Sequence, residues 1–233
     1  MISFMNNVKL AIFDFDGTLV SSIDGIAVCM QSALKRFGYD TPSRDELRAT
    51  VGKTLEESIR ILTASRCPEA EIPMVVRAYR EMYVEVSSQY TNLFDGAERV
   101  LTTFKRNGIK NVLVSNKGSV GLYPLLDKLQ ITGCFDVVLA ADQVCHTKPS
   151  ADLYETHIAS AFREIPTDQT IVVGDTATDI LFADNIGAVS CWASYGYGDA
   201  GECMNLNPKH VIATLADLLT IARLPAREPG LMP

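Results

Sequence analysis

The chain has 233 residues, of which 47% are hydrophobic and 21% charged, a balance typical of a folded globular protein rather than a disordered one. Its 28 acidic and 21 basic residues give a net charge of −7 with no long Lys/Arg cluster, which argues against nucleic-acid binding. No apolar run is long enough to span a membrane, and the N-terminal apolar stretch is broken by Asp14 and Asp16, so we expect a cytoplasmic protein without a signal peptide.

The first part of the chain predicts one strand followed by a helical region. Residues Val8–Phe13 are short and apolar and are followed at once by polar residues and a glycine, which is typical of a buried strand. From Ser21 to Tyr90, apolar residues recur at helical spacing and no strand pattern is found. Between two of these helical patterns, Thr54 with Glu57 three residues later forms a capping-box signature for the next helix.

Beyond residue 90, strand and helix patterns alternate. Strands are expected over Asn111–Val114, Asp136–Leu139, Thr170–Val173 and Ala188–Trp192, and helices over Gly96–Lys105, Val120–Leu129, Ser150–Phe162 and Thr176–Ile186. Alternation of this kind predicts an α/β fold, a Rossmann-like parallel sheet with helices on both faces. We therefore expect a core of residues 1–20 and 91–233 with a helical bundle, residues 21–90, inserted into it. The tail Leu224–Pro233, with three prolines, is expected to be poorly ordered.

Cysteine and histidine spacing does not indicate a disulfide framework or a zinc site. The six cysteines are scattered without a C-x-x-C pair, so we expect mostly buried, reduced thiols. His210 follows Pro208 and Lys209 and is expected in a surface loop.

Two carboxylates stand at the end of the first predicted strand, in the segment Phe13-Asp14-Phe15-Asp16-Gly17-Thr18-Leu19. Side chains two residues apart on a strand point the same way, and Gly17 permits a sharp turn there. Acids beside an apolar strand are costly unless a metal or another cation compensates them. One can then act as a nucleophile and the other as a proton donor, although a plain surface turn has the same pattern.

Polar residues also follow three later strands. Ser115 and Asn116 end the strand pattern around Val114, where a hydroxyl and backbone N–H groups can hold phosphate oxygens. Lys148 precedes a helical pattern and could neutralise a phosphate. Asp175 and Asp179 follow another apolar strand, and carboxylate oxygens suit Mg²⁺. Taken singly, these residues are equally typical of helix caps, first-turn acids and solvated loop lysines.

Taken together, the order and strand-end placement of these segments resemble the haloacid dehalogenase superfamily over essentially the whole chain. Asp14-Phe15-Asp16-Gly17-Thr18 resembles its first motif, Ser115 the second, Lys148 the third, and Gly174-Asp175 through Asp179 the fourth. The helical insert resembles the small cap of that superfamily. The features most similar to its phosphoglycolate phosphatase branch are Ala183, Gly187, Tyr195-Gly196-Tyr197-Gly198 and Ser115-Asn116-Lys117.

The resemblance implies a Mg²⁺-dependent phosphatase that hydrolyses small, phosphoglycolate-like phosphate monoesters. Asp14 would attack phosphorus to form an aspartyl phosphate, and Asp16 would protonate the leaving oxygen and then activate water. The phosphoryl group would be bound by Gly17, Thr18, Ser115, Asn116 and Lys148. Mg²⁺ would be bound by the Asp14 and Asp175 carboxylates and the Asp16 backbone carbonyl, with Asp179 orienting Lys148 or a metal-bound water.

Lys53, in the loop between two helical patterns of the cap, could meet an anionic group of the substrate, or it could be an exposed lysine in a turn. The expected partner of the protein is a small phosphorylated metabolite, and nothing in the sequence indicates an oligomeric state.

Competing functions remain open from the sequence. Asp16 favours phosphate-ester cleavage over dehalogenation, but a sugar phosphomutase of the same superfamily keeps the same acids. A non-enzymatic phospho-receiver would not need the helical insert. An inactive binding protein would be expected to have lost one of Asp14, Asp16, Lys148 or Asp175. Departures from the phosphoglycolate phosphatase branch occur at Ser21, at Ile186 and in Ser150-Ala151-Asp152. They leave the catalytic set intact but weaken inferences about the substrate.

Overall fold

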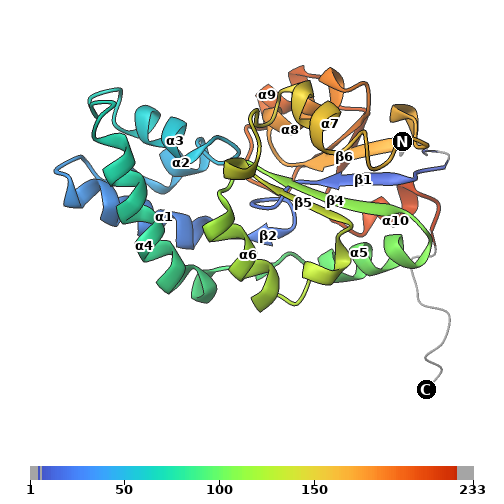
Figure 1. Cartoon of the computed structure of the whole chain (residues 1–233), viewed down its shortest axis with the longest axis horizontal. Helices are drawn as coiled ribbons and strands as arrows, with labels where there is room; N and C mark the ends of the chain where they lie inside the picture. The colour runs from blue at the N-terminus through green and yellow to red at the C-terminus, as the bar shows by residue number, and fades with distance from the viewer. Residues whose placement is uncertain (1–4, 6, 225–233) are drawn as a thin grey trace.

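Residues 5 and 7–224 are described by a computed structural model, in which a layered sheet lies beside a group of helices (Figure 1). The strands of the main sheet are β1 (Leu10–Phe13), β4 (Lys110–Ser115), β5 (Val137–Ala140), β6 (Thr170–Gly174), β7 (Val189–Ala193) and β8 (His210–Ile212). Their order across the sheet is β5-β4-β1-β6-β7-β8, and every neighbouring pair is parallel. The predicted α/β fold with a parallel sheet is confirmed.

Helices cover both faces of this sheet. One face carries α7 (Ala151–His157), α8 (Ala177–Asn185) and α9 (Ala200–Asn205), and the other carries α5 (Ala97–Arg106), α6 (Ser119–Lys128) and α10 (Asp217–Ile221) (Figure 1). Short 3-10 helices lie at Thr132–Cys134, Ala141–Gln143 and Thr167–Gln169.

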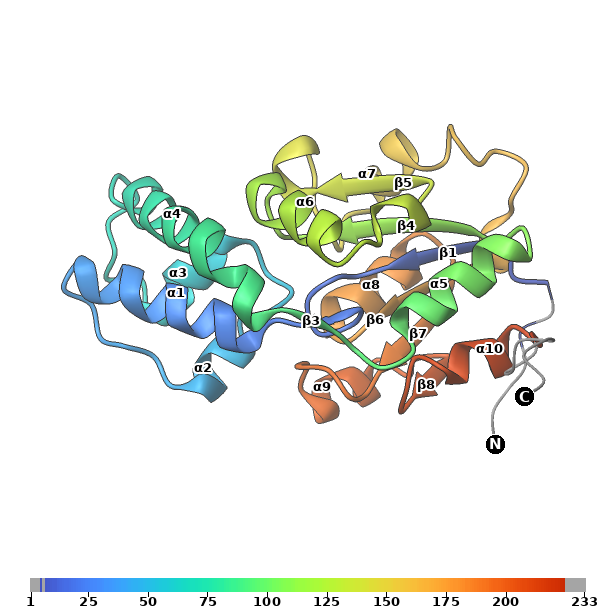
Figure 2. The ribbon, with the colours of Figure 1, turned by 90° about the horizontal axis from the view of Figure 1, so that it is seen from below.

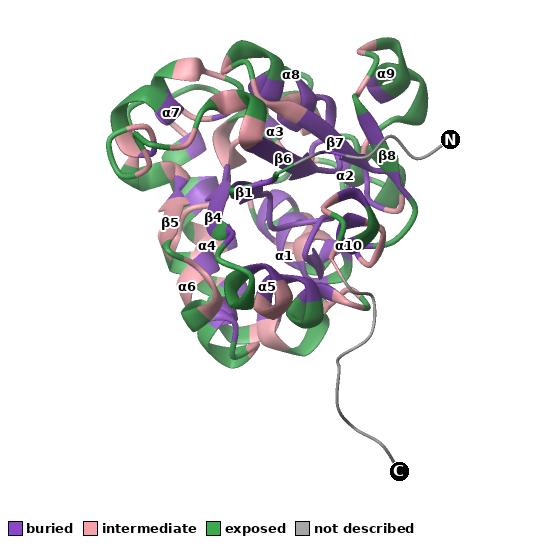
Figure 3. Cartoon of the chain, turned by 90° about the vertical axis from the view of Figure 1, so that its right-hand side faces the viewer, coloured by how far each residue is buried: buried purple, intermediate pink, exposed green. Residues whose placement is uncertain are grey.

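Side chains of β1 point alternately to the two faces of the sheet and pack into the apolar core on each face. Leu10 and Ile12 belong to the apolar cluster that includes Phe182 of α8, whereas Phe13 packs on the other face, its ring 6.1 Å from that of Phe104. Figure 3 shows the central strands β1 and β6 buried, while the outward surfaces of the covering helices are largely exposed. The central strand is therefore held rigidly, and so is the residue that follows it.

Residues 23–90, all of which the structure describes, contain helices and no strand. These are α1 (Ile23–Arg36), α2 (Arg44–Arg48), α3 (Leu55–Leu62) and α4 (Ile72–Tyr90). The predicted capping box of α3 is confirmed, because Thr54 Oγ1 accepts from the Glu57 N–H and the Glu57 carboxylate accepts from the Thr54 N–H. The chain enters and leaves this helical group through the antiparallel pair β2 (Val20–Ser21) and β3 (Asn92–Leu93), and the group lies beyond one end of the sheet (Figure 2).

Several elements differ from the sequence-based expectation. The helix predicted over Ser150–Phe162 ends at His157, because the following residues form turns in which Ile158 and Phe162 still pack on the sheet and keep the helical spacing. β2, β3 and β8 were not predicted, and Ser21, expected in the helical region, lies in β2, because such two- and three-residue strands are too short for a periodic pattern. The expected surface position of His210 is wrong: its backbone pairs with Cys191 in the sheet and its side chain is buried.

Other expectations concern the cysteines, the tail and membrane segments. All six cysteines are free, and four of them are buried, as predicted. Apart from Leu224, the tail lies outside the described residues. Within the described part of the chain, no helix combines the length and apolar composition that a bilayer span requires.

Candidate active site

Three buried carboxylates meet at the carboxyl ends of two neighbouring strands. Asp14 directly follows β1, Asp175 directly follows β6, and Asp179 lies in the first turn of α8. One oxygen from each of the three lies within 4.8 Å of the others. Because β1 and β6 are paired in register, the fold brings together acids that are distant in the sequence.

Lys148 is the cation among these acids. Its Nζ lies 2.6 Å from Oδ1 of Asp14 and 2.6 Å from Oδ1 of Asp179, and its side chain is only 2% exposed. Burial alone would lower the pKa of Lys148, but the two carboxylates outweigh that effect and hold the pKa above its usual value. Lys148 therefore stays protonated and offsets part of the negative charge of the cluster.

Burial and the neighbouring negative charges raise the pKa values of two of the acids. Burial is the largest influence on Asp14 and raises its pKa to about 7, although Lys148 opposes the shift. Burial also raises the pKa of Asp175 well above its usual value, and the charges of Asp14 and Asp179 add to this. Three carboxylates around one ammonium leave an excess of negative charge that a divalent cation would compensate.

Asp175 is fixed by residues from both ends of the chain. Its Oδ1 accepts from the Thr18 hydroxyl at 2.9 Å, and its Oδ2 accepts from the Tyr197 N–H at 2.7 Å. Gly17 has φ +91°, and a Cβ there would lie 2.3 Å from Asp175 Oδ2, so only glycine permits this close turn. Thr18, which the sequence predicts as a phosphate-binding residue, has its hydroxyl engaged with Asp175.

Asp179 is held by the start of its own helix. Its Oδ2 accepts from the Thr176 N–H at 3.1 Å and from the Thr176 hydroxyl at 2.8 Å, which leaves Oδ1 for Lys148. The sequence predicts Asp179 as a residue that orients Lys148, and the two side chains are in direct contact.

Asn116 links three separate segments. Its Oδ1 accepts from the Lys148 N–H at 3.1 Å, and its Nδ2 donates to the carbonyls of Lys148 and Gly52 at 3.1 and 2.8 Å. It thereby holds the Lys148 backbone beside the sheet and ties the loop before α3 to the end of β4. Ser115, the last residue of β4, is buried next to it.

The Asp16 carboxylate has two partners that the sequence did not indicate. Ser22 Oγ donates to its Oδ1 at 2.5 Å, and Lys117 Nζ lies 3.2 and 3.0 Å from its two oxygens. Burial alone would lower the pKa of Lys117, but Asp16 raises it well above its usual value. The sequence analysis identified Lys117 as part of the Ser115-Asn116-Lys117 segment of the site. It did not predict that Lys117 pairs with Asp16, because the two residues are far apart in the sequence.

A cavity of about 100 Å³ connects these residues to the helical group, and its lining includes Asp14, Asp16, Ser115 and Asn116. Lys53 also lines it, although its side chain is exposed to solvent. The neighbouring Gly52 has φ +89°, and a Cβ there would lie 2.8 Å from Thr176 Oγ1, so this loop lies directly against the core. Of the predicted site residues, the cavity is lined by Asp14, Asp16, Lys53, Ser115 and Asn116. The others lie behind this lining: Lys148 contacts Asp14 and Asp179, and Gly17 and Thr18 lie against Asp175.

The family model described as haloacid dehalogenase-like hydrolase matches residues 11–193. The chain is 28% identical over 230 residues to a phosphoglycolate phosphatase of Vibrio parahaemolyticus, covering 94% of this chain and 98% of that protein. It is 29% identical over 232 residues to a phosphoglycolate phosphatase of Vibrio cholerae, covering 95% and 100%.

Solved structures share the fold. A haloacid dehalogenase-like family hydrolase from Streptococcus pneumoniae superposes with a TM-score of 0.78 at 23% identity, over 91% of this chain and 97% of that chain. CbbY from Rhodobacter sphaeroides, solved in complex with phosphate, gives a TM-score of 0.78 at 19% identity, over 93% and 100%.

Proposed function

The chain belongs to the haloacid dehalogenase-like hydrolases, and from this membership we propose that it hydrolyses small phosphate monoesters with Asp14 as the nucleophile. It is a phosphoric monoester hydrolase, as are the curated relatives named phosphoglycolate phosphatase. Phosphoglycolate is accordingly the reference substrate of the proposal. The observation that carries it is the cluster of three buried carboxylates around Lys148 at one end of the cavity-lining strands.

Asp14 is suited to attack a phosphoryl group. Its N–H donates to the Val173 carbonyl at 2.9 Å, which fixes its backbone, and its carboxylate lines the cavity. Attack by its carboxylate forms an aspartyl phosphate and releases the alcohol, and attack by water then releases inorganic phosphate and restores the carboxylate. Lys148 reduces the repulsion between this carboxylate and the anionic substrate.

Asp16 is proposed to move the protons. In the first step it gives a proton to the leaving alkoxide oxygen, and in the second it takes one from the attacking water. Ser22 and Lys117 hold its carboxylate at the edge of the cavity that Asp14 also lines, so both acids can reach one bound phosphate ester. Ser115 and Asn116, at the end of β4, border the same space and would contact the phosphoryl oxygens.

The donor set fits a divalent metal ion. Asp14 and Asp175 offer hard carboxylate oxygens within 4.8 Å of each other and of Asp179, and Lys148 leaves much of their charge uncompensated. We propose that Mg²⁺ is held by Asp14, by Asp175 and by the backbone carbonyl of Asp16, with Asp179 beside it. The ion would supply positive charge at the phosphoryl oxygens.

The helical segment of residues 21–90 is proposed to act as a cap that limits substrate size. The hydrogen bond from Asn116 to the Gly52 carbonyl and the contact of Gly52 with Thr176 support this, because they hold the loop that carries Lys53 over the strand ends. A covered site excludes bulky phosphoproteins and limits water around the reacting groups.

The proposal is tested by assaying the purified protein on phosphoglycolate and p-nitrophenyl phosphate with Mg²⁺. We expect release of inorganic phosphate, loss of activity after chelation, and recovery when Mg²⁺ is restored. Free inorganic phosphate separates hydrolysis from transfer to a second sugar hydroxyl, as a phosphomutase would perform. Activity that is unchanged by exhaustive chelation would contradict the metal-dependent mechanism.

A further inference from the structure

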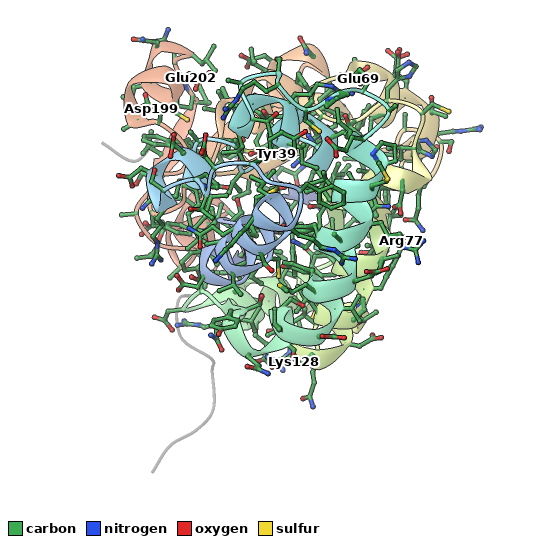
Figure 4. All side chains as sticks on the ribbon, turned by 90° about the vertical axis from the view of Figure 1, so that its left-hand side faces the viewer. Tyr39, Glu69, Arg77, Lys128, Asp199 and Glu202 are labelled. Carbon is green, nitrogen blue, oxygen red and sulfur yellow. The ribbon has the colours of Figure 1, made fainter. Side chains whose placement is uncertain are left out.

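Apolar and aromatic side chains form much of the wall of the cavity on the cap side, where Thr50, Ser58, Glu56 and Arg80 are the polar lining residues besides the exposed Lys53. Ile26 and Met30 of α1, Leu55 of α3, Tyr79 and Tyr83 of α4, and Val120 of α6 line the same space as Asp14 and Asp16. Seen from the cap side, α4 carries Arg77 on its outer surface, pointing away from the molecule (Figure 4). The same helix turns Tyr79, Arg80 and Tyr83 toward the cavity.

This wall is held in place by its own contacts. The rings of Tyr79 and Tyr83 stack with centroids 5.4 Å apart and planes 19° apart. Lys117 Nζ lies 4.3 Å from the centroid of the Tyr83 ring, a cation–π contact that joins the wall to the core. Both tyrosines are less than 10% exposed, so the wall is a preformed surface rather than a mobile one.

The basic groups that line the cavity differ in how far they are already paired. Lys117 is paired with both oxygens of Asp16, and Arg80 lies 3.9 Å from Glu56. Lys53 has no ion-pair partner in the described part of the chain, but it lies at the exposed edge. A carboxylate placed against the apolar wall would lose its hydration without a new partner, which is costly.

We infer that the leaving alcohol of the preferred substrate is short, uncharged and apolar, so that the substrate class is a small alkyl phosphate monoester. This inference rests on the proposed function and refines its substrate. The phosphoryl group would take up the strand-end side of this cavity, beside Asp14, which leaves the alcohol the space between that group and the wall. Apolar carbons of that alcohol would leave water for the wall formed by α1 and α4, a favourable transfer of about 0.8 kcal/mol per methylene.

A matched set of esters tests the inference. Isobutyl phosphate is nearly isosteric with phosphoglycolate, since a branched pair of methyl groups replaces the two carboxylate oxygens, and ethyl phosphate is a shorter alkyl reference. We expect kcat/KM for isobutyl phosphate to exceed that for phosphoglycolate and that for ethyl phosphate, each by roughly tenfold. Equal values, or a preference for phosphoglycolate, would overturn the inference.

Binding of non-hydrolysable analogues separates the inference from the proposed function. Calorimetry with Mg²⁺ and the native protein compares 3-methylbutylphosphonate with 3-phosphonopropionate, the analogues of the two isosteric esters. Binding of 3-methylbutylphosphonate that is tighter by roughly tenfold supports the apolar pocket, whether or not any ester is hydrolysed. A failure to hydrolyse any ester would refute only the proposed function. Tighter binding of the carboxylate analogue overturns the inference whatever the activity.

Two pocket variants and one matched control locate the effect. Ile26→Asn places an amide in the wall from α1, and Val120→Asn does so from α6 at a half-exposed position that tolerates a polar residue. Each should lower kcat/KM for isobutyl phosphate severalfold while changing that for ethyl phosphate less. Val28→Asn, on the exposed side of α1, should leave both values unchanged. If the two pocket variants lower kcat/KM for both esters by the same factor, the wall does not contact the alcohol and the inference fails.

Discussion

Nζ of Lys148 lies 2.6 Å from Oδ1 of Asp14, although 134 residues separate the two in the sequence. The contact exists because Asn116 holds the Lys148 backbone beside β4 while β1 delivers Asp14 to the adjacent position in the sheet. It places a permanent positive charge at the carboxylate proposed to attack phosphorus, and the same ammonium also pairs with the buried Asp179.

Replacing this lysine should therefore affect stability as well as activity. Lys148→Met leaves the carboxylates uncompensated, and the loss of one partner of a buried ion pair costs about 3 kcal/mol. We expect that loss in urea unfolding with EDTA, and a smaller one with Mg²⁺, which would compensate the same acids. Lys110→Met, which removes an exposed pair with Asp136, should cost no more than about 1 kcal/mol under both conditions. Equal losses for Lys148→Met with and without Mg²⁺ would argue against a metal at this cluster.

The raised pKa of Asp14 predicts a pH dependence of the metal-free protein. A carboxyl with a pKa near 3.8 when unfolded and about 7 when folded binds more protons in the folded state between those values. Stability contributed by this group is therefore lost as pH rises through that window. In EDTA, Asp14→Asn should be more stable than the native protein at pH 8, by at least about 1 kcal/mol, since one pKa unit is worth about 1.4 kcal/mol. The difference in stability between the two proteins should vanish near pH 4. An Asp14→Asn variant that is less stable than the native protein at pH 8 would refute the raised pKa of Asp14.

Asp16 should matter most for esters with poor leaving groups. Asp16→Asn keeps the shape but removes the proton donor, so activity on ethyl phosphate should fall by at least about 100-fold. The fall on p-nitrophenyl phosphate should be much smaller, because nitrophenolate leaves without protonation. Steady-state kinetics on the two esters measures the contrast, and losses of the same size on both would exclude the acid role.

Lys53 could meet the carboxylate of phosphoglycolate, the less favoured ester, at the exposed edge of the cavity and away from the apolar wall. Lys53→Ala should raise KM for phosphoglycolate by roughly tenfold, the equivalent of about 1.4 kcal/mol, and should change KM for p-nitrophenyl phosphate little. The exposed position of Lys53 at the cavity makes it the one basic lining residue without an ion-pair partner in the described part of the chain. An equal change of KM for both substrates, or no change for either, would show that Lys53 does not contact the carboxylate of phosphoglycolate.

Much of the fold followed from patterns that act locally. The apolar runs at β1, β4 and β6 and the polar residues at their ends predicted a parallel sheet and a shared site, because parallel strands end at one edge. Short elements such as β8 carry too few residues for a periodic pattern, and their burial depends on the strand beside them.

Partnerships across long sequence distances were not predictable in the same way. The ion pair of Lys117 with Asp16 and the hydrogen bond of Thr18 to Asp175 are set by which strand ends lie side by side. The position of the cap loop on Asn116 likewise depends on the packing of two separately formed layers. The chemistry of the acids was readable from residue type and placement, whereas the partners that orient them required the three-dimensional arrangement.

The central claim is that Asp14 is the nucleophile of a phosphatase, and kcat of Asp14→Asn on p-nitrophenyl phosphate with Mg²⁺ tests it most directly. The substitution keeps the shape of the side chain but removes the attacking carboxylate, so kcat should fall by at least about 10³-fold relative to the native protein, as in other losses of a central catalytic group. Turnover within about tenfold of the native value, in a preparation verified by mass to carry asparagine, would contradict the account.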